Sequence, residues 1–169
     1  MGNGDEVRWL SSEQQQSWRA YIMGTELLQH QLDRELREEH DISFSEYEIL
    51  VRLSESPGRS LRMSHLASHT LASRSRLSHQ VDRLERAGLV ERQACESDRR
   101  GANAVLTDLG WSTLVEAAPT HVEGVRRHLV DRLTDEQFAD LGDALSIVAK
   151  HLQGLEPDCE SSSAGVLTD

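Results

Sequence analysis

Apolar residues recur at helical spacing through most of this chain, which predicts a mostly α-helical protein. Between residues 11 and 39 they form one apolar seam, made by Trp18, Ile22, Leu28, Leu32 and Leu36. A helix of that length extends about 40 Å at 1.5 Å per residue, farther than so small a domain can cover. We therefore expect a partner chain to cover part of the seam.

A second helix is predicted from residue 43, where the sequence offers two alternative capping boxes. Ser43 with Glu46 and Ser45 with Glu48 both fit the S-x-x-E pattern, which satisfies free backbone N–H groups. The sequence leaves open which pair is used. The apolar positions of this helix are Tyr47, Leu50 and Leu53. A short strand is expected at residues 59–61.

The segment from residue 61 to 107 combines a helix, a turn, a second helix and a β-hairpin. A short helix is predicted at residues 64–69, a turn at residues 70–72, and an N-cap at Ser73. The second helix has an apolar stripe at Leu77, Val81 and Leu84. Its opposite face carries Ser75, Arg76, His79, Arg83 and Arg86. A helix that is apolar on one side and rich in arginine on the other suits a DNA major groove.

A β-hairpin is predicted after this helix, which Gly88 ends in the left-handed conformation. Its strands are expected at residues 89–94 and 102–106. The hairpin tip would then hold Asp98, Arg99, Arg100 and Gly101. Adjacent arginines at a hairpin tip suit the narrow, negative minor groove.

Two stretches of this segment resemble the winged helix-turn-helix of the MarR family of bacterial transcription regulators. They are LERAGLVER at residues 84–92 and DRRGANAVLTDLG at residues 98–110, the second fitting the family's D-x-R wing followed by L-T-x-x-G. The similarity extends from about residue 11 to residue 152. It implies a mostly α fold, a winged helix-turn-helix with long N- and C-terminal dimerisation helices and one small antiparallel β-wing.

Two more helices are predicted after the hairpin. Thr107 caps the first, in which Pro119 predicts a kink or a break. Thr134 and Gln137 form a T-x-x-Q capping box for the last helix. The apolar stripe of that helix is Phe138, Leu141, Leu145, Val148 and Leu152.

These elements divide the chain into four regions. Residues 1–10 are expected to be a flexible N-terminus, and residues 41–106 the winged helix-turn-helix DNA-binding domain. Residues 11–40 and 107–155 form the helical dimerisation region, as the resemblance implies. Residues 156–169 are serine-rich and acidic, and are expected to be a disordered tail.

The distribution of charge agrees with DNA binding although the whole chain is acidic. The net charge is −11, but residues 59–100 hold nine arginines and five acidic residues, a net of +4 that leaves −15 for the rest. A basic island within an acidic body orients a protein on a polyanion. The alternative interpretation of the charge alone is a solvated helix face.

We predict DNA contacts from the second helix, its surroundings and the hairpin: Arg62, Ser73, Arg74, Ser75, Arg76, His79, Gln80, Arg83, Arg99 and Arg100. Ser75, Arg76 and His79 are expected near base edges, and Arg74 and Arg83 on phosphates. Arg100 matches the D-x-R arginine and is the minor-groove candidate, with Asp98 as wing support. Two such helices related by a two-fold axis require an inverted-repeat operator in double-stranded DNA.

The resemblance also implies regulation by a small-molecule effector bound between the dimer helices and the winged domain. Trp18, His30, Tyr47 and Arg62 are the candidate pocket residues. The predicted function is thus a homodimeric repressor of its own and neighbouring genes, released by a ligand. A repressor and an activator are not distinguished by the sequence.

A zinc-responsive regulator of the same fold is one alternative, since some MarR relatives sense zinc with the first and fifth helices. The available residues are His30, Glu39, His40, His121 and His128. None of these histidines pairs at H-x-x-x-H spacing and neither helix contains a cysteine, so no metal site is predicted. Cys95 in the wing is either a small strand residue or an oxidisable thiol.

An enzyme is the rival of a different class, and a helical protein-interaction dimer without DNA binding is the other alternative. The chain contains no G-x-S-x-G elbow, glycine-rich phosphate loop or H-E-x-x-H motif, so neither catalytic residues nor a cofactor are predicted. No apolar run reaches the length of a membrane span, and no secretory signal is evident. We therefore expect a cytoplasmic protein that does not bind membranes.

Overall fold

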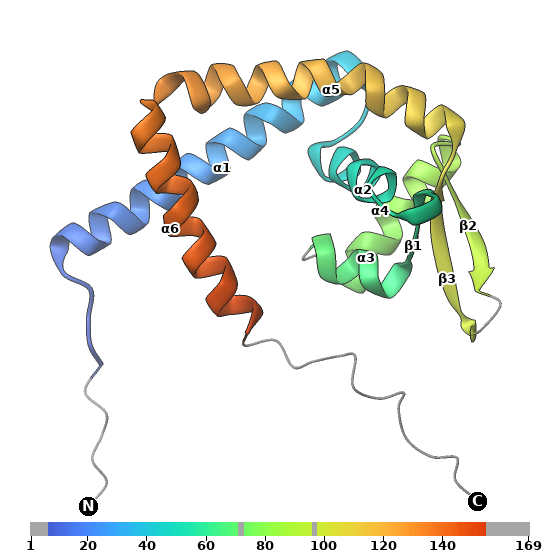
Figure 1. The fold of residues 1–169 in the computed structure, drawn as a ribbon, viewed down its shortest axis with the longest axis horizontal. Helices are drawn as coiled ribbons and strands as arrows, with labels where there is room; N and C mark the ends of the chain where they lie inside the picture. The colour runs from blue at the N-terminus through green and yellow to red at the C-terminus, as the bar shows by residue number, and fades with distance from the viewer. Residues whose placement is uncertain (1–6, 71–72, 96–97, 155–169) are drawn as a thin grey trace, which may run out of the picture. The chain divides into compact units, whose positions relative to one another are not determined.

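The computed structural model describes residues 7–70, 73–95 and 98–154, without the side chains of residues 69, 74, 95 and 98–100. Figure 1 shows a mostly α-helical chain with one small sheet, as predicted. The elements are α1 (Ser12–His40), α2 (Phe44–Ser54), η1 (Pro57–Arg59), β1 (Ser60–Arg62), α3 (Met63–Thr70), α4 (Arg74–Arg86), β2 (Val90–Cys95), β3 (Asp98–Leu106), α5 (Asp108–His128), η2 (Val130–Arg132) and α6 (Asp135–Gln153). The chain separates into two compact units, Met1–His128 and Leu129–Asp169.

Helix α1 begins and ends at defined caps. The Ser11 side chain accepts from the backbone N–H of Gln14, whose side chain accepts in return from Ser11. Asp41 ends the helix in the left-handed conformation, with φ of 55°. The predicted seam is buried only in its second half, at Leu32 and Leu36, whereas Trp18 is 55% exposed.

Helix α2 uses the first of the two possible capping boxes. The Ser43 hydroxyl accepts from the backbone N–H of Glu46 at 3.2 Å, and the Glu46 carboxylate accepts from the backbone N–H of Ser43 at 2.8 Å. Ser45 makes a different contact, described below. Asp33 of α1 fixes the same end of α2, because its carboxylate accepts from the backbone N–H of Phe44 at 2.8 Å.

The three strands form one antiparallel sheet in the order β1-β3-β2, with β3 in the centre. Ser60 of β1 lies opposite Val105, so the strand predicted at residues 59–61 is present one residue further on. Val90 at the start of β2 lies opposite Leu106 at the end of β3. The sheet therefore joins the segment before α3 to the wing.

The hairpin is longer than its sequence pattern predicts. β2 continues to Cys95 and β3 begins at Asp98. The prediction that residues 98–101 form the tip is therefore wrong, because these residues belong to β3 and Asp98 pairs with Cys95. The register shifts between Ala94 and Cys95, which lie opposite Ala102 and Asp98 respectively. Thr70, predicted in a turn, is the last residue of α3, and residues 71–72 lie outside the described part.

A tight corner joins α4 to the wing and to α5. The N–H of Leu89 donates to the carbonyl of Leu84 at 2.9 Å while Gly88 adopts φ of 73°, a Schellman ending for α4. Thr107 then links this corner to α5. Its hydroxyl donates to the carbonyl of Gly88 at 2.7 Å and accepts from the N–H of Gly110 at 2.9 Å.

Gly110 allows α5 to start directly against this corner. A Cβ atom added at Gly110 would lie 2.0 Å from the carbonyl oxygen of Leu89 and 2.7 Å from a Leu106 methyl group. No side chain fits there. The glycine of the L-T-x-x-G motif is therefore required by the close approach of a helix to the first residues of the wing.

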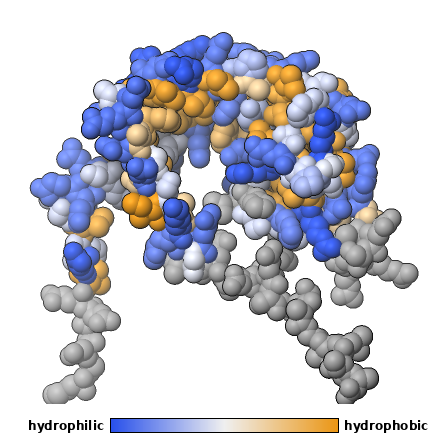
Figure 2. Space-filling model, viewed as in Figure 1, coloured by the Kyte–Doolittle hydropathy of each residue, from blue (hydrophilic) through white to orange (hydrophobic). Residues whose placement is uncertain are grey.

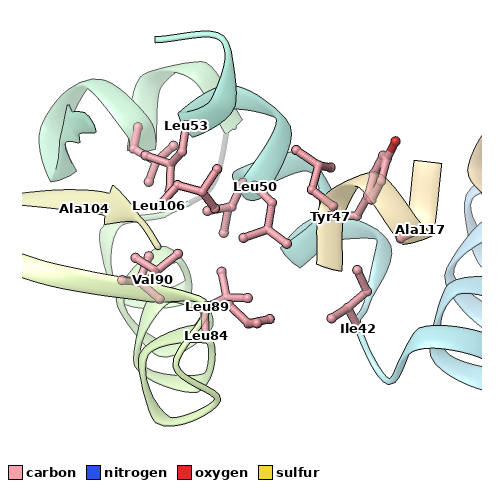
Figure 3. Close-up of a cluster of buried hydrophobic side chains, with 14 of the residues drawn as sticks. Ile42, Tyr47, Leu50, Leu53, Leu84, Leu89, Val90, Ala104, Leu106 and Ala117 are labelled. Carbon is pink, nitrogen blue, oxygen red and sulfur yellow. The ribbon is translucent and has the colours of Figure 1, made fainter. Parts of the chain in front are cut away.

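The core of the first unit is centred on α2 (Figure 3). Leu50 and Leu53 of α2 face Leu84 of α4 and the strand residues Val90, Ala104 and Leu106. Leu66 of α3 and Leu77 and Val81 of α4 are also fully buried, at 0–1% exposure. Burial of each such leucine contributes about 1.5–3 kcal/mol relative to leaving it exposed. The predicted stripes of α2 and α4 are thus confirmed.

Helix α5 lies along the second half of α1 (Figure 1). The contact is close at Gly124, where an added Cβ atom would lie 2.6 Å from the Glu35 carboxylate and 2.8 Å from Leu32. α5 is one continuous helix through Pro119, so of the two predicted alternatives, a kink or a break, the break is wrong. Proline removes one backbone hydrogen bond, and packing of the flanking turns on α1 keeps the helix together.

The second unit contains α6, which begins at the predicted capping box. The Thr134 hydroxyl accepts from the N–H of Gln137 at 3.2 Å. Its apolar stripe is exposed, with Phe138 at 40% and Val148 at 52%. Apolar patches are visible over α5 and over α6 in Figure 2. Within the described residues, no helix has both the length and the apolar character needed to cross a bilayer.

Candidate nucleic-acid interface

Helix α4 presents a polar face away from the core. The Ser73 hydroxyl caps the helix by accepting from the backbone N–H of Arg76 at 3.3 Å. Ser75, Arg76 and His79 are exposed, whereas Leu77 on the other side is buried. The helix thus offers three hydrogen-bonding side chains near its N-terminus, as the sequence pattern predicts.

Two of the predicted DNA contacts point toward α2 instead. Nε2 of Gln80 donates to Oγ of Ser45 at 2.7 Å. Nε of Arg83 lies 3.0 Å from Oε1 of Glu46, whose side chain is only 4% exposed. The sequence gives no signal for these pairings, since the partners lie 35 and 37 residues apart in the chain.

Arg92 is a functional candidate that the sequence pattern does not predict. Its guanidinium forms ion pairs with Asp82 and, at 2.7 Å, with Glu85, and donates to the carbonyl of Ser78 at 3.1 Å. The backbone N–H of Arg92 also donates to Glu85 at 3.1 Å. Glu85 and Arg92 belong to the LERAGLVER stretch, so this stretch fixes the first strand of the wing to α4.

The remaining predicted contacts are only partly described. Arg62 is exposed at the end of β1. The side chains of Arg74, Asp98, Arg99 and Arg100 lie outside the described part of the chain, so their roles stay predictions.

A cavity of about 400 Å³ lies between α2 and α5, and no residue of α4 is among its lining residues in the described part of the chain. Its lining residues are Phe44, Tyr47, Glu48, Val51, Arg52, Glu55 and His121. Of the four predicted effector-pocket residues, only Tyr47 is in this set. Trp18 and His30 are exposed on α1, where Trp18 stacks on Tyr21 at 5.8 Å, and Arg62 lies on β1.

Burial changes the acid–base behaviour of this cavity. The His121 ring lies 4.7 Å from the Tyr47 ring, and its Nδ1 is buried without a hydrogen-bond partner among the described residues. Burial lowers the pKa of His121 below its ordinary value. Burial raises the pKa of Glu48, against the opposing effect of the Arg52 guanidinium. The cavity therefore combines an aromatic wall with two ionisable groups in which burial favours the uncharged form.

The histidines considered as zinc ligands make other contacts. Nε2 of His128 lies 2.8 Å from Glu35, and Nε2 of His40 lies 2.8 Å from the Thr120 hydroxyl. In the part of the chain that the structure describes, no three His, Cys, Asp or Glu side chains are grouped to hold a metal ion. The contacts observed for His40 and His128 join α1 to α5.

Comparison with known proteins places this geometry in a family. The MarR family profile matches residues 40–101, which include α2 to the start of β3. The HTH-type transcriptional regulator PecS of Dickeya dadantii is 31% identical over 114 residues, covering 67% of this chain and 68% of PecS. These relatives are transcriptional regulators rather than enzymes.

Two solved structures from Streptomyces coelicolor are similar over nearly their whole length. AbsC, a MarR family transcriptional regulator, is 49% identical with a TM-score of 0.81, covering 88% of this chain and 99% of AbsC. Sco3205, a MarR family transcriptional regulator solved in complex with DNA, is 48% identical with a TM-score of 0.84, covering 92% and 95%. With the α4 face, the wing and the L-T-x-x-G corner in place, the chain belongs to the MarR family of winged helix-turn-helix transcription regulators.

Proposed function

We propose that this protein is a homodimeric, sequence-specific DNA-binding repressor of its own and neighbouring genes. The observation that carries the proposal is the exposed row Ser75, Arg76 and His79, on a helix whose opposite side is buried in the core. Side chains near the N-terminus of such a helix reach base edges in the major groove. The similarity to Sco3205, which was solved in complex with DNA, supports the same partner here.

The wing is proposed to contribute the second contact. Arg99 and Arg100 belong to the strand that follows the hairpin connection, and Arg100 is the minor-groove candidate with Asp98 as its support. Arg62 and Arg74 are proposed to approach phosphates. Arg92 keeps the wing beside α4, so that helix and wing can bind adjacent grooves of one duplex.

Dimerisation is proposed for residues 11–40 and 107–155. Large apolar side chains are exposed on α1, α5 and α6, including Trp18, Val122 and Ile147 at 55%, 54% and 71%. Exposed apolar surface on this scale marks a protein–protein contact. A two-fold dimer carries two copies of α4 and therefore fits an inverted repeat.

Release by a small-molecule effector is proposed at the cavity beside Tyr47 and His121. Its volume of about 400 Å³ lies within the range of ligand pockets. An effector there would contact α2, which carries the core against which α4 packs. The chemistry that would suit the cavity is a ring with a polar substituent, because aromatic and polar groups share its wall.

The proposal is tested by incubating the purified protein with fragmented genomic DNA and sequencing the fragments that it retains. We expect enrichment of a few sites with inverted repeats, one of them upstream of the protein's own gene. Arg76→Ala is expected to reduce the preference among fragments as well as affinity. Retention of all fragments equally, by the wild type at moderate salt, would contradict sequence-specific binding.

A further inference from the structure

Two side chains of α4 attach this helix to the start of α2. Nε2 of Gln80 donates to Oγ of Ser45 at 2.7 Å, and Nε of Arg83 lies 3.0 Å from Oε1 of Glu46. Gln80 and Arg83 are three residues apart, so they lie on the same edge of the helix. By the helical period, Arg83 lies on the face that carries Arg76 and His79, and Gln80 lies at the border of that face.

The Glu46 carboxylate is held in one position by its hydrogen bonds to Ser43. Its Oε2 accepts from the backbone N–H of Ser43 at 2.8 Å and from the Ser43 hydroxyl at 2.7 Å, which leaves Oε1 for Arg83. The residue is only 3% exposed. A buried carboxylate is costly unless it is paired and hydrogen-bonded. Arg83 supplies the positive charge in contact with it, and Nη2 of Arg83 also lies 4.0 Å from Oδ1 of the exposed Asp41.

The start of α2 is in turn fixed to α1. Asp33 accepts from the backbone N–H of Phe44 at 2.8 Å and from Nε of Arg37 at 2.7 Å. The start of α2, which carries Glu46, is therefore hydrogen-bonded to α1. Contacts with this end of α2 can thus fix the position of α4.

We propose that Glu46 and Arg83 are a positioning pair, which sets the rotation of α4 in the major groove. Arg83 acts through Glu46 and not by neutralising a phosphate. This inference rests on the proposed function, since it concerns how the same DNA-binding helix is held. Gln80 and Ser45 support the pair from the preceding turn of α4.

Arg76 offers the matched comparison on the same helix. It is exposed, and among the described residues it has no ion-pair partner. Arg76 is proposed to contact DNA directly. The affinity lost on changing Arg76 should therefore be the same whether or not Glu46 is also changed. The effects of changing Arg83 and Glu46 should instead depend on each other.

The experiment uses two duplexes: the one that the wild type enriches most from a random-sequence pool, and a scrambled duplex of the same composition. Dissociation constants are measured across a salt series for Glu46→Gln, Arg83→Gln, Arg76→Gln and the two double variants that combine Glu46→Gln with each arginine change. Circular dichroism and thermal unfolding report whether each variant is folded. Glu46→Gln keeps an oxygen that accepts from Ser43 and is the decisive variant if Arg83→Gln does not fold.

We expect Glu46→Gln to weaken binding to the selected duplex about tenfold, although it removes a negative charge close to a polyanion. Arg83→Gln should weaken binding by a similar factor, and the double variant Glu46→Gln/Arg83→Gln should weaken it no further. The salt dependence of binding to the scrambled duplex should be the same for these variants as for the wild type. The fold losses in affinity caused by Glu46→Gln and by Arg76→Gln should multiply in the double variant that combines them.

A phosphate contact gives a different pattern. Arg83→Gln would then weaken binding to both duplexes by the same factor and lower the slope of log affinity against log salt by about 0.9. Glu46→Gln would bind as tightly as the wild type or more tightly, and either of these results overturns the positioning role. If the wild type enriches no duplex, the proposed function fails and the positioning role with it.

Discussion

A single methyl group added at Gly110 would meet both the corner after α4 and the end of β3. Gly110 lies where the end of β3, the start of α5 and the corner after α4 meet, with the carbonyl of Leu89 directly against its Cα. Such contacts cannot be relieved by a rotamer change, because one partner is backbone. The Thr107 hydroxyl adds a hydrogen bond to the N–H of Gly110, so the residue cannot move away freely.

We predict that Gly110→Ala lowers the free energy of unfolding by about 1–3 kcal/mol or more, the cost of overpacking a filled site. Urea unfolding followed by circular dichroism measures it. Ser112→Ala, an exposed position on the same helix, is the control and should change stability by less than about 0.5 kcal/mol. Equal stability of the two variants would show that the corner is loose.

His121 gives a prediction about pH. Its pKa is lowered by burial from an ordinary value of 6.5, so the unfolded chain binds this proton more readily than the folded chain. The free energy of unfolding therefore falls as the pH drops through about 6.5, until the folded pKa is reached. Glu48 in the same cavity acts in the opposite direction, because burial raises its pKa and the folded chain therefore binds this proton more readily than the unfolded chain.

His121→Phe isolates this effect, since phenylalanine keeps a ring beside Tyr47 and removes the buried Nδ1. We expect the variant to lose less stability than the wild type between about pH 7 and pH 5. Thermal unfolding of both proteins in the same buffers measures the difference. Parallel pH profiles would mean that His121 is protonated equally well in the folded and unfolded chains.

At the scale of elements, α4 is held on both sides by charged contacts. Glu46 of α2 holds one side through Arg83, and Arg92 of β2 holds the other through Asp82 and Glu85. The wing and α2 therefore both fix the orientation of α4. Neither contact involves the exposed Ser75 and His79.

We predict that Arg92→Gln destabilises the protein by about 1–2 kcal/mol, because a charge-assisted contact is lost and the Ser78 carbonyl loses a donor. Chemical unfolding measures the loss. Arg86→Gln is the matched control, because the exposed Arg86 donates only to the carbonyl of Asp82, at 3.2 Å, in the described structure. A loss as large for Arg86→Gln as for Arg92→Gln would show that the wing contact adds nothing.

The sequence predicted elements better than it predicted contacts between them. Caps and periodicity placed α1, α2, α4 and α6 within one or two residues, because these signals are local. The hairpin tip was misplaced, because β3 already begins at Asp98, which pairs with Cys95 across a register shift that the sequence pattern does not indicate. Ser45, the alternative cap, instead accepts a hydrogen bond from Gln80, which is distant in sequence.

The candidate site shows the same division. Exposure of Ser75, Arg76 and His79 follows from the helical period, so the sequence alone predicts it. The engagement of Arg83 by Glu46 does not, since α2 and α4 are brought together only by the fold. The sequence predicts Arg83 as a phosphate contact. The proposed role of Arg83 in positioning α4 replaces that prediction.

At the scale of the whole molecule, the proposed dimer would cover the exposed apolar side chains of α1 and α6. Val148→Glu places a charge within the exposed stripe of α6 and is expected to shift the protein from dimer toward monomer. Sedimentation velocity at several protein concentrations measures this shift. Ser146→Glu, at an exposed polar position of the same helix, should leave the dimer unchanged, and dissociation by both variants would point to general charge repulsion.

The central claim is that two copies of α4, held in one dimer, bind one duplex. Sedimentation of the protein mixed with a labelled duplex that carries the selected inverted repeat measures the number of chains bound. The account predicts two chains on each duplex, and loss of stable binding when one half-site is scrambled. A single chain bound with full affinity to one half-site would contradict it.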